Sequence, residues 1–219
     1  KQKNRKTMQL ETLQNKSKDD FKAIGFPTKK HENWLYWTPD NDHDTLEKNY
    51  YEKSNTIVET NTIIIKNGSL RSKPTIDGVT ITNDTKQSND ESLQFNLKSS
   101  SLSYLNSAYS NEIVTIRCSE KIKEPITIII ESDHNEECVT VNSKINLIVE
   151  ENSAITASLY HQKKGSNTTI TNTSFELVCK DNADVNINHV FKDNPSKAFF
   201  HSIIHMHEKS KCNHITYVA

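Results

Sequence analysis

The chain has 219 residues, of which 33% are hydrophobic and 25% are charged. Its 27 Lys and Arg residues nearly balance its 28 Asp and Glu residues, which leaves a formal net charge of −1. This near-neutral balance excludes the strong field by which proteins attract nucleic acid or an anionic membrane. The longest apolar runs are strand-sized, so we expect neither nucleic acid nor membrane as a partner.

The cysteines are widely separated and include no Cys-x-x-Cys pair; they are Cys118, Cys138, Cys179 and Cys212. Such spacing favours free thiols over a disulfide scaffold, because disulfide-rich domains are small and carry many cysteines. We therefore expect the protein to reside in a reducing compartment.

The first predicted element is an amphipathic helix. Its apolar residues recur on one face, at Met8, Leu10, Leu13, Phe21 and Ile24. Gly25 is a typical residue after a helix end, and Pro27 stands two residues beyond it. The helix is therefore expected to end where an aromatic segment, residues 25–37, begins.

The next part of the chain predicts a hairpin, a second turn and a helix. Asn67-Gly68 separates two extended runs, and this pair suits a two-residue turn because both residues can adopt positive φ. Asp77-Gly78 predicts another turn before the run at 79–82. Residues 93–110 suit a helix.

Short strands separated by turn residues dominate the chain after residue 111. They are predicted at 113–118, 126–131, 145–149, 155–160, 175–179, 185–191 and 203–207. The segments Ile145–Ile155 and Phe175–Val185 are self-similar at an offset of 30 residues, and Asn152 matches Asn182. A third, poorer copy is expected to begin near Ile203 or Ile204.

A repeat of this length with strands and no helix predicts the stacked coils of a β-solenoid. A Greek-key sandwich would also give short strands at this spacing, but it would not require the copy. We divide the chain into a helical region with the aromatic motif (1–60), a hairpin, linker and short helix (61–110), and the start of a parallel β-helix (111–219). The strand-like run 215–219 suggests a truncated piece of a longer protein.

No residue pattern points clearly to catalysis. His31-Glu32 could form an acid–base pair, but adjacent side chains diverge on a helix or strand and no third group is visible to orient the imidazole. Trp34, Tyr36 and Trp37 are expected to anchor the helical segment on the β domain, since aromatic side chains bury large areas. The chain contains no G-x-S-x-G, no phosphate-binding Gly-rich loop and no H-E-x-x-H.

The segment His201–His214 is rich in metal-ligating residue types. Two imidazoles at His205 and His207 would share one face of a strand, and Cys212 and His214 could approach them across a turn. A His₃Cys set of this kind would suit zinc or iron. The alternative is that Ile204 and Met206 face inward and the two histidines form the solvated face, and we favour it because the spacing matches no established metal motif.

The aromatic segment carries a family resemblance. Residues 25–36, GFPTKKHENWLY, resemble the G-[LF]-P-T-[RK]-[KR]-x-E-x-W-[RK]-Y-T signature of the SufB/SufD family, and its SufD branch most of all. The matching structural motif residues are Gly25, Pro27, Glu32, Trp34 and Tyr36, whereas Leu35 and Trp37 depart from the signature. Weaker matches follow in the family's order at Ile63–Leu70, Leu105–Tyr109 and Ile122–Ile126.

The resemblance implies a right-handed parallel β-helix that follows a helical N-terminal region. It implies a scaffold, not an enzyme, that acts with SufB and the ATPase SufC in iron–sulfur cluster assembly, in a plastid-type organelle (apicoplast or chloroplast stroma) or a bacterial cytoplasm. The cluster belongs to the complete complex, so we assign this chain no catalytic and no cofactor-binding residue. The later coils and the SufC-docking helices lie beyond the matched region, so we expect the open solenoid end to form a homodimer.

Two other functions are compatible with the pattern. A polysaccharide-lyase-like or carbohydrate-binding β-helix would need aligned Asp, Arg and Lys on successive coils, where the repeat offers Glu151 and Asp181 and little else. A metal carrier would use the His201–His214 cluster, with His205, His207, Cys212 and His214 as the candidate ligands.

If Trp34 packs the N-terminal helix on the β domain, Trp34→Ala should lower the free energy of unfolding by about 3–5 kcal/mol, as other buried aromatic truncations do. His31→Ala, in the same segment, should cost much less. Chemical denaturation of the two variants measures this, and the opposite ranking would reject the packing interpretation.

Overall fold

The computed structural model describes residues 10–26, 45, 48–52, 57–58, 62–84, 101–164, 169–191 and 197–218. These residues form the helices α1 (Leu10–Ile24) and α3 (Ser101–Tyr109). Before α3 come the strands β1 (Asn49–Tyr50), β2 (Ile57–Val58), β3 (Thr62–Lys66), β4 (Ser69–Lys73) and β5 (Val79–Asp84). After α3 come β6 (Ile113–Cys118), β7 (Ile126–Asp133), β8 (Val139–Val149), β9 (Ala154–Lys164), β10 (Thr169–Cys179), β11 (Asp184–Phe191), β12 (Lys197–Met206) and β13 (Lys211–Val218).

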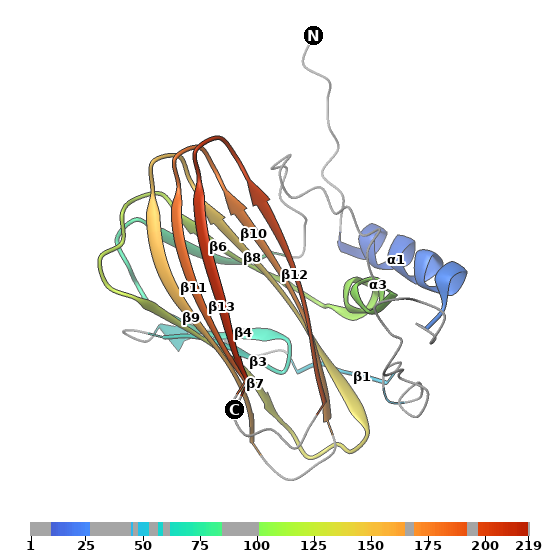
Figure 1. Cartoon of the computed structure of the whole chain (residues 1–219). Coiled ribbons are helices and arrows are strands. Elements are labelled where there is room, and N and C mark those ends of the chain that lie inside the picture. Colours follow the sequence, from blue (N-terminus) through green and yellow to red (C-terminus); the bar gives the residue numbers. More distant parts are fainter. Residues whose placement is uncertain are drawn as a thin grey trace.

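The strands after α3 alternate between two parallel sheets. One sheet holds β6, β8, β10 and β12, and the other holds β7, β9, β11 and β13. Each coil contributes one strand to each sheet, so successive coils stack along the molecule (Figure 1). The predicted parallel β-solenoid is confirmed, and the sandwich is excluded because a sandwich is built from antiparallel sheets. The right-handed sense of the coils stays a prediction.

Alternation within each strand places one set of side chains in the space between the two sheets, here called the lumen. Ile145 and Phe175 pair in register and are fully buried there, as are Val149 and Cys179. Both pairs coincide with the apolar positions of the 30-residue copy. Cys179 therefore packs in the hydrophobic core as a small apolar side chain.

The tight turn of each coil depends on one residue with left-handed backbone geometry. Asn152, Asn182 and Lys209 have φ values of 60°, 57° and 57° at equivalent positions of successive coils. Asn adopts this conformation more readily than other side-chain-bearing residues. Asn182 Nδ2 also donates a hydrogen bond of 3.2 Å to Asn152 Oδ1, so the turn residues are linked from coil to coil.

The third copy begins at Ser202, which pairs with Phe175, one residue before the start predicted near Ile203 or Ile204. The cause is a shorter connection between β11 and β12. The chain advances nine residues from His161 to Ile170, but only six between their register partners Phe191 and Lys197. A fixed offset of 30 therefore misplaces the third copy.

The N-terminal end of the solenoid is covered by strands that precede it. β5 pairs antiparallel with β6, and β3 pairs with β7. The predicted β3–β4 hairpin is confirmed, with φ values of 51° at Asn67 and 79° at Gly68. A Cβ on Gly68 would lie 2.7 Å from the Asn142 carbonyl oxygen, so only glycine fits this close approach. The second predicted turn is also present, with a φ of 75° at Gly78.

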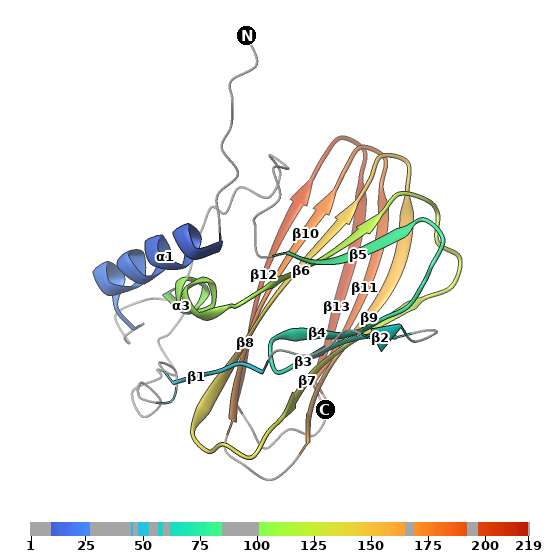
Figure 2. The same ribbon diagram turned by 180° about the vertical axis from the view of Figure 1, so that it is seen from behind.

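The two helices lie together on one side of the solenoid, outside the sheet that contains β8 and β10 (Figure 2). α1 ends as predicted, because the Gly25 N–H donates to the Phe21 carbonyl at 2.7 Å and Gly25 has a φ of 72°. Of the helix predicted at 93–110, the described part begins at Ser101. Asn106 Nδ2 holds α3 on the sheet by donating to the carbonyls of Ser143 (3.0 Å) and Asn172 (2.6 Å).

Neither described helix combines the length and the apolar character that a membrane span requires.

Substitution of the turn asparagine tests the tight turns. Asn182→Val should lower the free energy of unfolding by about 1–2 kcal/mol, because a β-branched residue is strained at positive φ. Asn182→Gly should change it by less, since glycine adopts this geometry without strain. Asn186→Val, on the extended strand β11, is the matched control and should have little effect. Urea denaturation measures all three, and equal losses at positions 182 and 186 would contradict the proposed role of the turn.

Candidate functional site

The candidate metal ligands of the His201–His214 segment do not converge. His205 lies on the outer face of β12, where Nε2 contacts Glu176 Oε1 at 2.9 Å. β12 ends at Met206, so His207 lies in the tight turn, with Nδ1 3.8 Å from Asp181 Oδ1. Ile204 and Met206 pair in register with the lumen residues Leu177 and Cys179, so they lie on the inner side of β12, as the favoured alternative predicts.

The other two candidates belong to β13 and lie on the inner side of the coil. Cys212 packs against the lumen core, and its thiol hydrogen-bonds that of Cys179. His214 contacts the aromatic rings of Phe175 and Phe200. Within the described ranges, no group of three or more His, Cys, Asp or Glu residues is placed to hold a metal ion.

Most of the aromatic motif lies outside the described residues. This applies to Pro27, Glu32, Trp34 and Tyr36, and also to His31 and Trp37. Gly25 caps α1, and Phe26 packs edge-on against Phe21 with ring centroids 5.0 Å apart. The start of the motif therefore joins the apolar contact between α1, α3 and the sheet.

A cluster of acidic and basic side chains lies on the outer face of the sheet that α3 contacts. Lys144 of β8 is fully buried, and its Nζ donates to Ser107 Oγ of α3 at 2.8 Å. Glu176 of β10 is 2% exposed and contacts His205 through Oε1. Glu176 Oε2 and both amide atoms of Asn146 are buried and have no hydrogen-bond partner within the described part of the chain.

Burial is the largest cause of the pKa shifts of Lys144 and Glu176 in this cluster. It lowers the pKa of Lys144 to about 7, and the charge of Glu176 opposes this shift only in part. Burial likewise raises the pKa of Glu176, although His205 and Lys144 favour its charged form. A lysine near neutrality is capable of proton transfer. Lys144, however, is covered by α3, so the cluster is better suited to fixing the helix on the sheet than to contacting a substrate.

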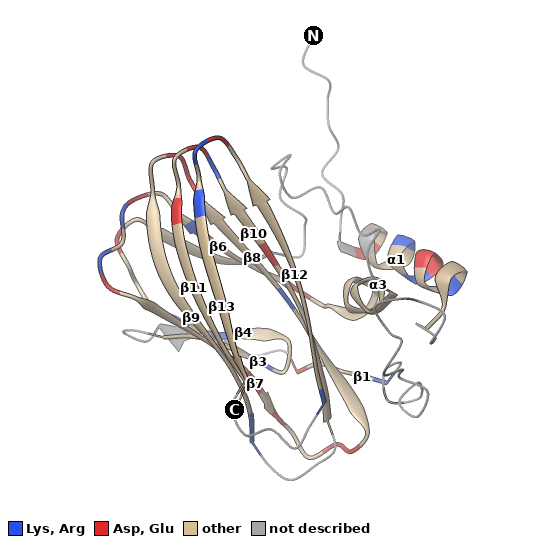
Figure 3. Ribbon diagram, viewed as in Figure 1, with Lys and Arg blue, Asp and Glu red and all other residues tan. Residues whose placement is uncertain are grey.

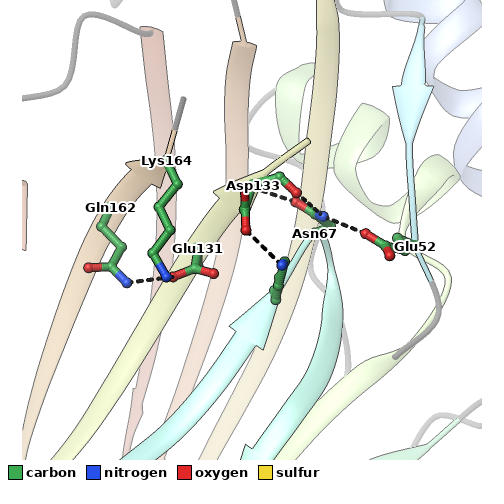
Figure 4. A network of polar contacts seen from close by, with 7 residues as sticks. Glu52, Asn67, Glu131, Asp133, Gln162 and Lys164 are labelled. Atoms are coloured by element: carbon green, nitrogen blue, oxygen red, sulfur yellow. Dashed lines mark hydrogen bonds and ion pairs between the residues drawn. The ribbon is translucent and has the colours of Figure 1, made fainter. Parts of the chain in front are cut away.

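A second polar network joins the hairpin to the first coils (Figure 4). Asn67 is buried, and its Nδ2 donates to Glu52 Oε2 at 3.0 Å and to the Asp133 carbonyl at 2.8 Å. The Asp133 N–H returns a bond of 2.9 Å to Asn67 Oδ1. Lys66 and Asp133 form an ion pair at 2.7 Å, which raises the pKa of Lys66 and lowers that of Asp133. The side-chain amide of Asn67 thus takes the place of a neighbouring strand, because it pairs with the backbone N–H and carbonyl of Asp133 at the end of β7.

Next to this network, Glu131 receives Gln162 Nε2 at 2.7 Å and Lys164 Nζ at 2.8 Å (Figure 4). These contacts tie β7 to β9. In both parts of this network the polar groups bond to one another, so we interpret the network as structural.

Charged residues also collect at the tight turns, whereas the strands between them carry fewer (Figure 3). Glu150 forms one ion pair with Arg117 and another with Lys180, the latter at 2.9 Å. Glu151, Asp181 and Glu208 occupy equivalent turn positions on successive coils. The row extends the Glu151 and Asp181 pair seen in the repeat.

Lys144 and Glu176 were missed by reasoning from the sequence. A signal was present, since polar and apolar residues alternate through Lys144, Ile145, Asn146 and Leu147. It indicated an outer face, but not that a helix would cover that face.

Neither a scan against protein-family models nor a search of curated proteins finds a match to this chain.

The pH dependence of stability should reveal the buried lysine. The folded-state pKa of Lys144 lies near 7, below the ordinary 10.5, so the unfolded chain binds a proton that the native chain lacks between these values. The stability contributed by Lys144 is therefore present above pH 10.5 and is lost as pH falls towards 7. Lys144→Met should become progressively more stable than the wild type between pH 10 and pH 7, by on the order of a few kcal/mol.

Urea denaturation at pH 7, 8.5 and 10 measures this difference. Lys123→Met, at an exposed position, is the matched control and should show a constant offset from the wild type. Parallel pH profiles for Lys144→Met and the wild type would contradict the buried-amine interpretation.

Proposed function

We propose that this chain is a scaffold subunit of iron–sulfur cluster assembly, of the SufB/SufD type, which acts with SufB and the ATPase SufC and carries out no catalysis itself. The observation that carries the proposal is the succession of an aromatic G-F-P-T-K-K-x-E-x-W motif and a parallel β-solenoid. The motif supports the family assignment, and the solenoid agrees with the fold that the family implies.

The weaker matches support the proposal by their positions in the fold. Ile63–Leu70 spans the β3–β4 hairpin at the start of the solenoid, and Leu105–Tyr109 forms part of α3. Ile122–Ile126 leads into β7. Each match therefore falls on the kind of element that the resemblance implies, in the same order along the chain.

The polar clusters favour a structural role over an enzymatic one. Lys144 is buried under α3, Glu176 is buried beside His205, and the Asn67 network is internally paired. The turn residue Glu150 is engaged by Arg117 and Lys180, which leaves its carboxylate little capacity to bind a sugar. These contacts give no specific support to a lyase-like function.

The C-terminal edge of the solenoid supports an assembly role. β12 and β13 are edge strands, each paired on one side in the described structure. Ile204, Met206, Ile215, Tyr217 and Val218 expose 37–82% of their surface at this end. Exposed edges that carry large apolar side chains favour pairing with further strands. We therefore place the contact with SufB, or with a second copy of the chain, at this edge.

Co-purification with SufB and SufC tests the proposed function. The wild-type chain should be retained by SufB or should self-associate as a two-fold dimer, and Tyr217→Lys should abolish both because it places a charge at the edge. Tyr160→Lys is the matched control, since Tyr160 is also exposed but lies on β9, inside the sheet. Sedimentation equilibrium measures self-association.

A wild-type chain that stays monomeric and is not retained by SufB would contradict the proposal. Equal loss of assembly in Tyr217→Lys and Tyr160→Lys would place the contact elsewhere than the edge.

A further inference from the structure

Three histidines line the lumen in a diagonal row. His161, His189 and His214 come from β9, β11 and β13, which are adjacent strands of one sheet. His161 pairs in register with Phe191, and His189 pairs with Thr216. Each further histidine of the row therefore lies on the next coil, two residues before the register partner of the previous histidine. The ring centroids are 4.8 Å apart for His161 and His189, and 6.1 Å apart for His189 and His214.

Aromatic rings surround this row. Phe200, from the opposite sheet, lies 3.9 Å from His189 and 6.3 Å from His214, measured between ring centroids. Phe191 lies 4.6 Å from His161 and 4.3 Å from His189. Burial in these surroundings lowers the pKa of His161 to about 3 and that of His189 to about 4. Both imidazoles are therefore neutral at physiological pH, and each keeps a nitrogen lone pair.

Five of the six ring nitrogens of the row have no hydrogen-bond partner among the described residues. This holds for Nδ1 and Nε2 of His161 and His189, which are 1% and 0% exposed, and for Nε2 of His214. Buried polar atoms in native proteins are nearly always satisfied by protein, water or an ion. Five such atoms in one row indicate a site for a ligand that accepts electron pairs from, or hydrogen-bonds to, neutral imidazole.

The spacing of two of these rings suits a single ion held between them. With metal–nitrogen bonds of about 2.0 Å and each nitrogen roughly 1.2 Å from its ring centre, two imidazoles on opposite sides of one ion have centroids about 6.4 Å apart. The His189–His214 distance of 6.1 Å is close to this value. We propose that His189 and His214 Nε2 form a two-coordinate site for a soft monovalent metal ion such as Cu(I), with the His161 ring beside it.

Charge and ligand number select a monovalent ion over zinc or iron. The described residues contain no group of three or more His, Cys, Asp or Glu placed around one ion, whereas structural zinc needs four ligands. The rings that contact the row are aromatic and supply no carboxylate, so a divalent charge would be poorly compensated. Imidazole suits copper, and the face of Phe200 would further stabilise a single positive charge.

The neighbouring thiols are the competing ligands. Cys179 and Cys212 also lie at this end of the lumen and contact each other, but burial raises the pKa of Cys179 to about 12 and also raises that of Cys212. Since thiolate is also a strong ligand for Cu(I), the experiment below includes a variant without these two thiols. An ion can reach His214 from outside, because His214 lies on the edge strand and is not fully buried.

Each histidine has a register partner on the preceding coil, so replacing the histidine by the residue type of that partner should preserve the packing of the lumen. His189 pairs with Leu159 and His214 pairs with Ile187, which makes His189→Leu and His214→Ile the test variants. His205 pairs with Val178 on the outer face, so His205→Val is the matched control. The exposed Cys138 is replaced by Ser throughout, and Cys179→Ala/Cys212→Ala removes the competing thiols.

Anaerobic competition between the chain and bicinchoninate for Cu(I) measures affinity and stoichiometry. The wild type, His205→Val and the cysteine variant should each bind one equivalent. His189→Leu and His214→Ile should lose affinity by on the order of a hundredfold or more, since even the outer-shell partners of a ligand contribute up to that much. In the wild type, ¹⁵N-histidine NMR should show one nitrogen of each of these two rings shifting on addition of Cu(I), a result that does not depend on any variant folding.

Absence of Cu(I) binding by the wild type would overturn the proposal. So would binding that survives in both histidine variants and disappears in the cysteine variant, because it would assign the ion to the thiols. The metal-site proposal does not rest on the proposed assembly function. The outcome of the Cu(I) experiment is therefore independent of the outcome of the co-purification experiment.

Discussion

The structure depends on keeping consecutive coils in one parallel register. β8 and β10 pair over their whole length, and β10 continues the same register onto β12. A slip of one residue would move every inward side chain to the outer face. The register is maintained at the tight turns, where Asn152, Asn182 and Lys209 each reverse the chain with the same left-handed geometry. Two of these positions are asparagine, so the chain builds its turns with few glycines.

The sheet that carries β8 and β10 is covered on both faces, and this explains its unusual polar content. Every residue of these two strands is buried, by the lumen core on one side and by cover that includes α3 on the other. Parallel sheets are usually covered by apolar layers. Here the outer layer contains Asn142, Lys144 and Asn172, whose contacts with α3 and with each other are directional. Directional contacts of this kind fix the position of the helix more narrowly than apolar packing alone.

The two ends of the solenoid differ in their chemistry. At the N-terminal end, β3 and β5 pair with the first coil, β4 pairs with β3, and the Asn67 network joins the hairpin to β7. At the other end, β12 and β13 each pair on one side only within the described structure, and apolar side chains are exposed there. The interior near the open end also holds the histidine row, so an assembly surface and an internal ligand site would lie close together without sharing residues.

The sequence by itself determined the elements that depend on local chemistry. The Asn67-Gly68 hairpin, the Gly25 helix end and the strand alternation follow from backbone preferences and from burial of every second residue, and the match of Asn152 with Asn182 revealed the repeat. Only the tertiary structure decided which side chains meet. It placed His205 on the outer face and Cys212 and His214 towards the lumen, and it brought the third copy forward because one connection is shorter. It also placed Lys144 beneath α3 and His161, His189 and His214 in one row, since contacts between coils depend on register, which no single strand encodes.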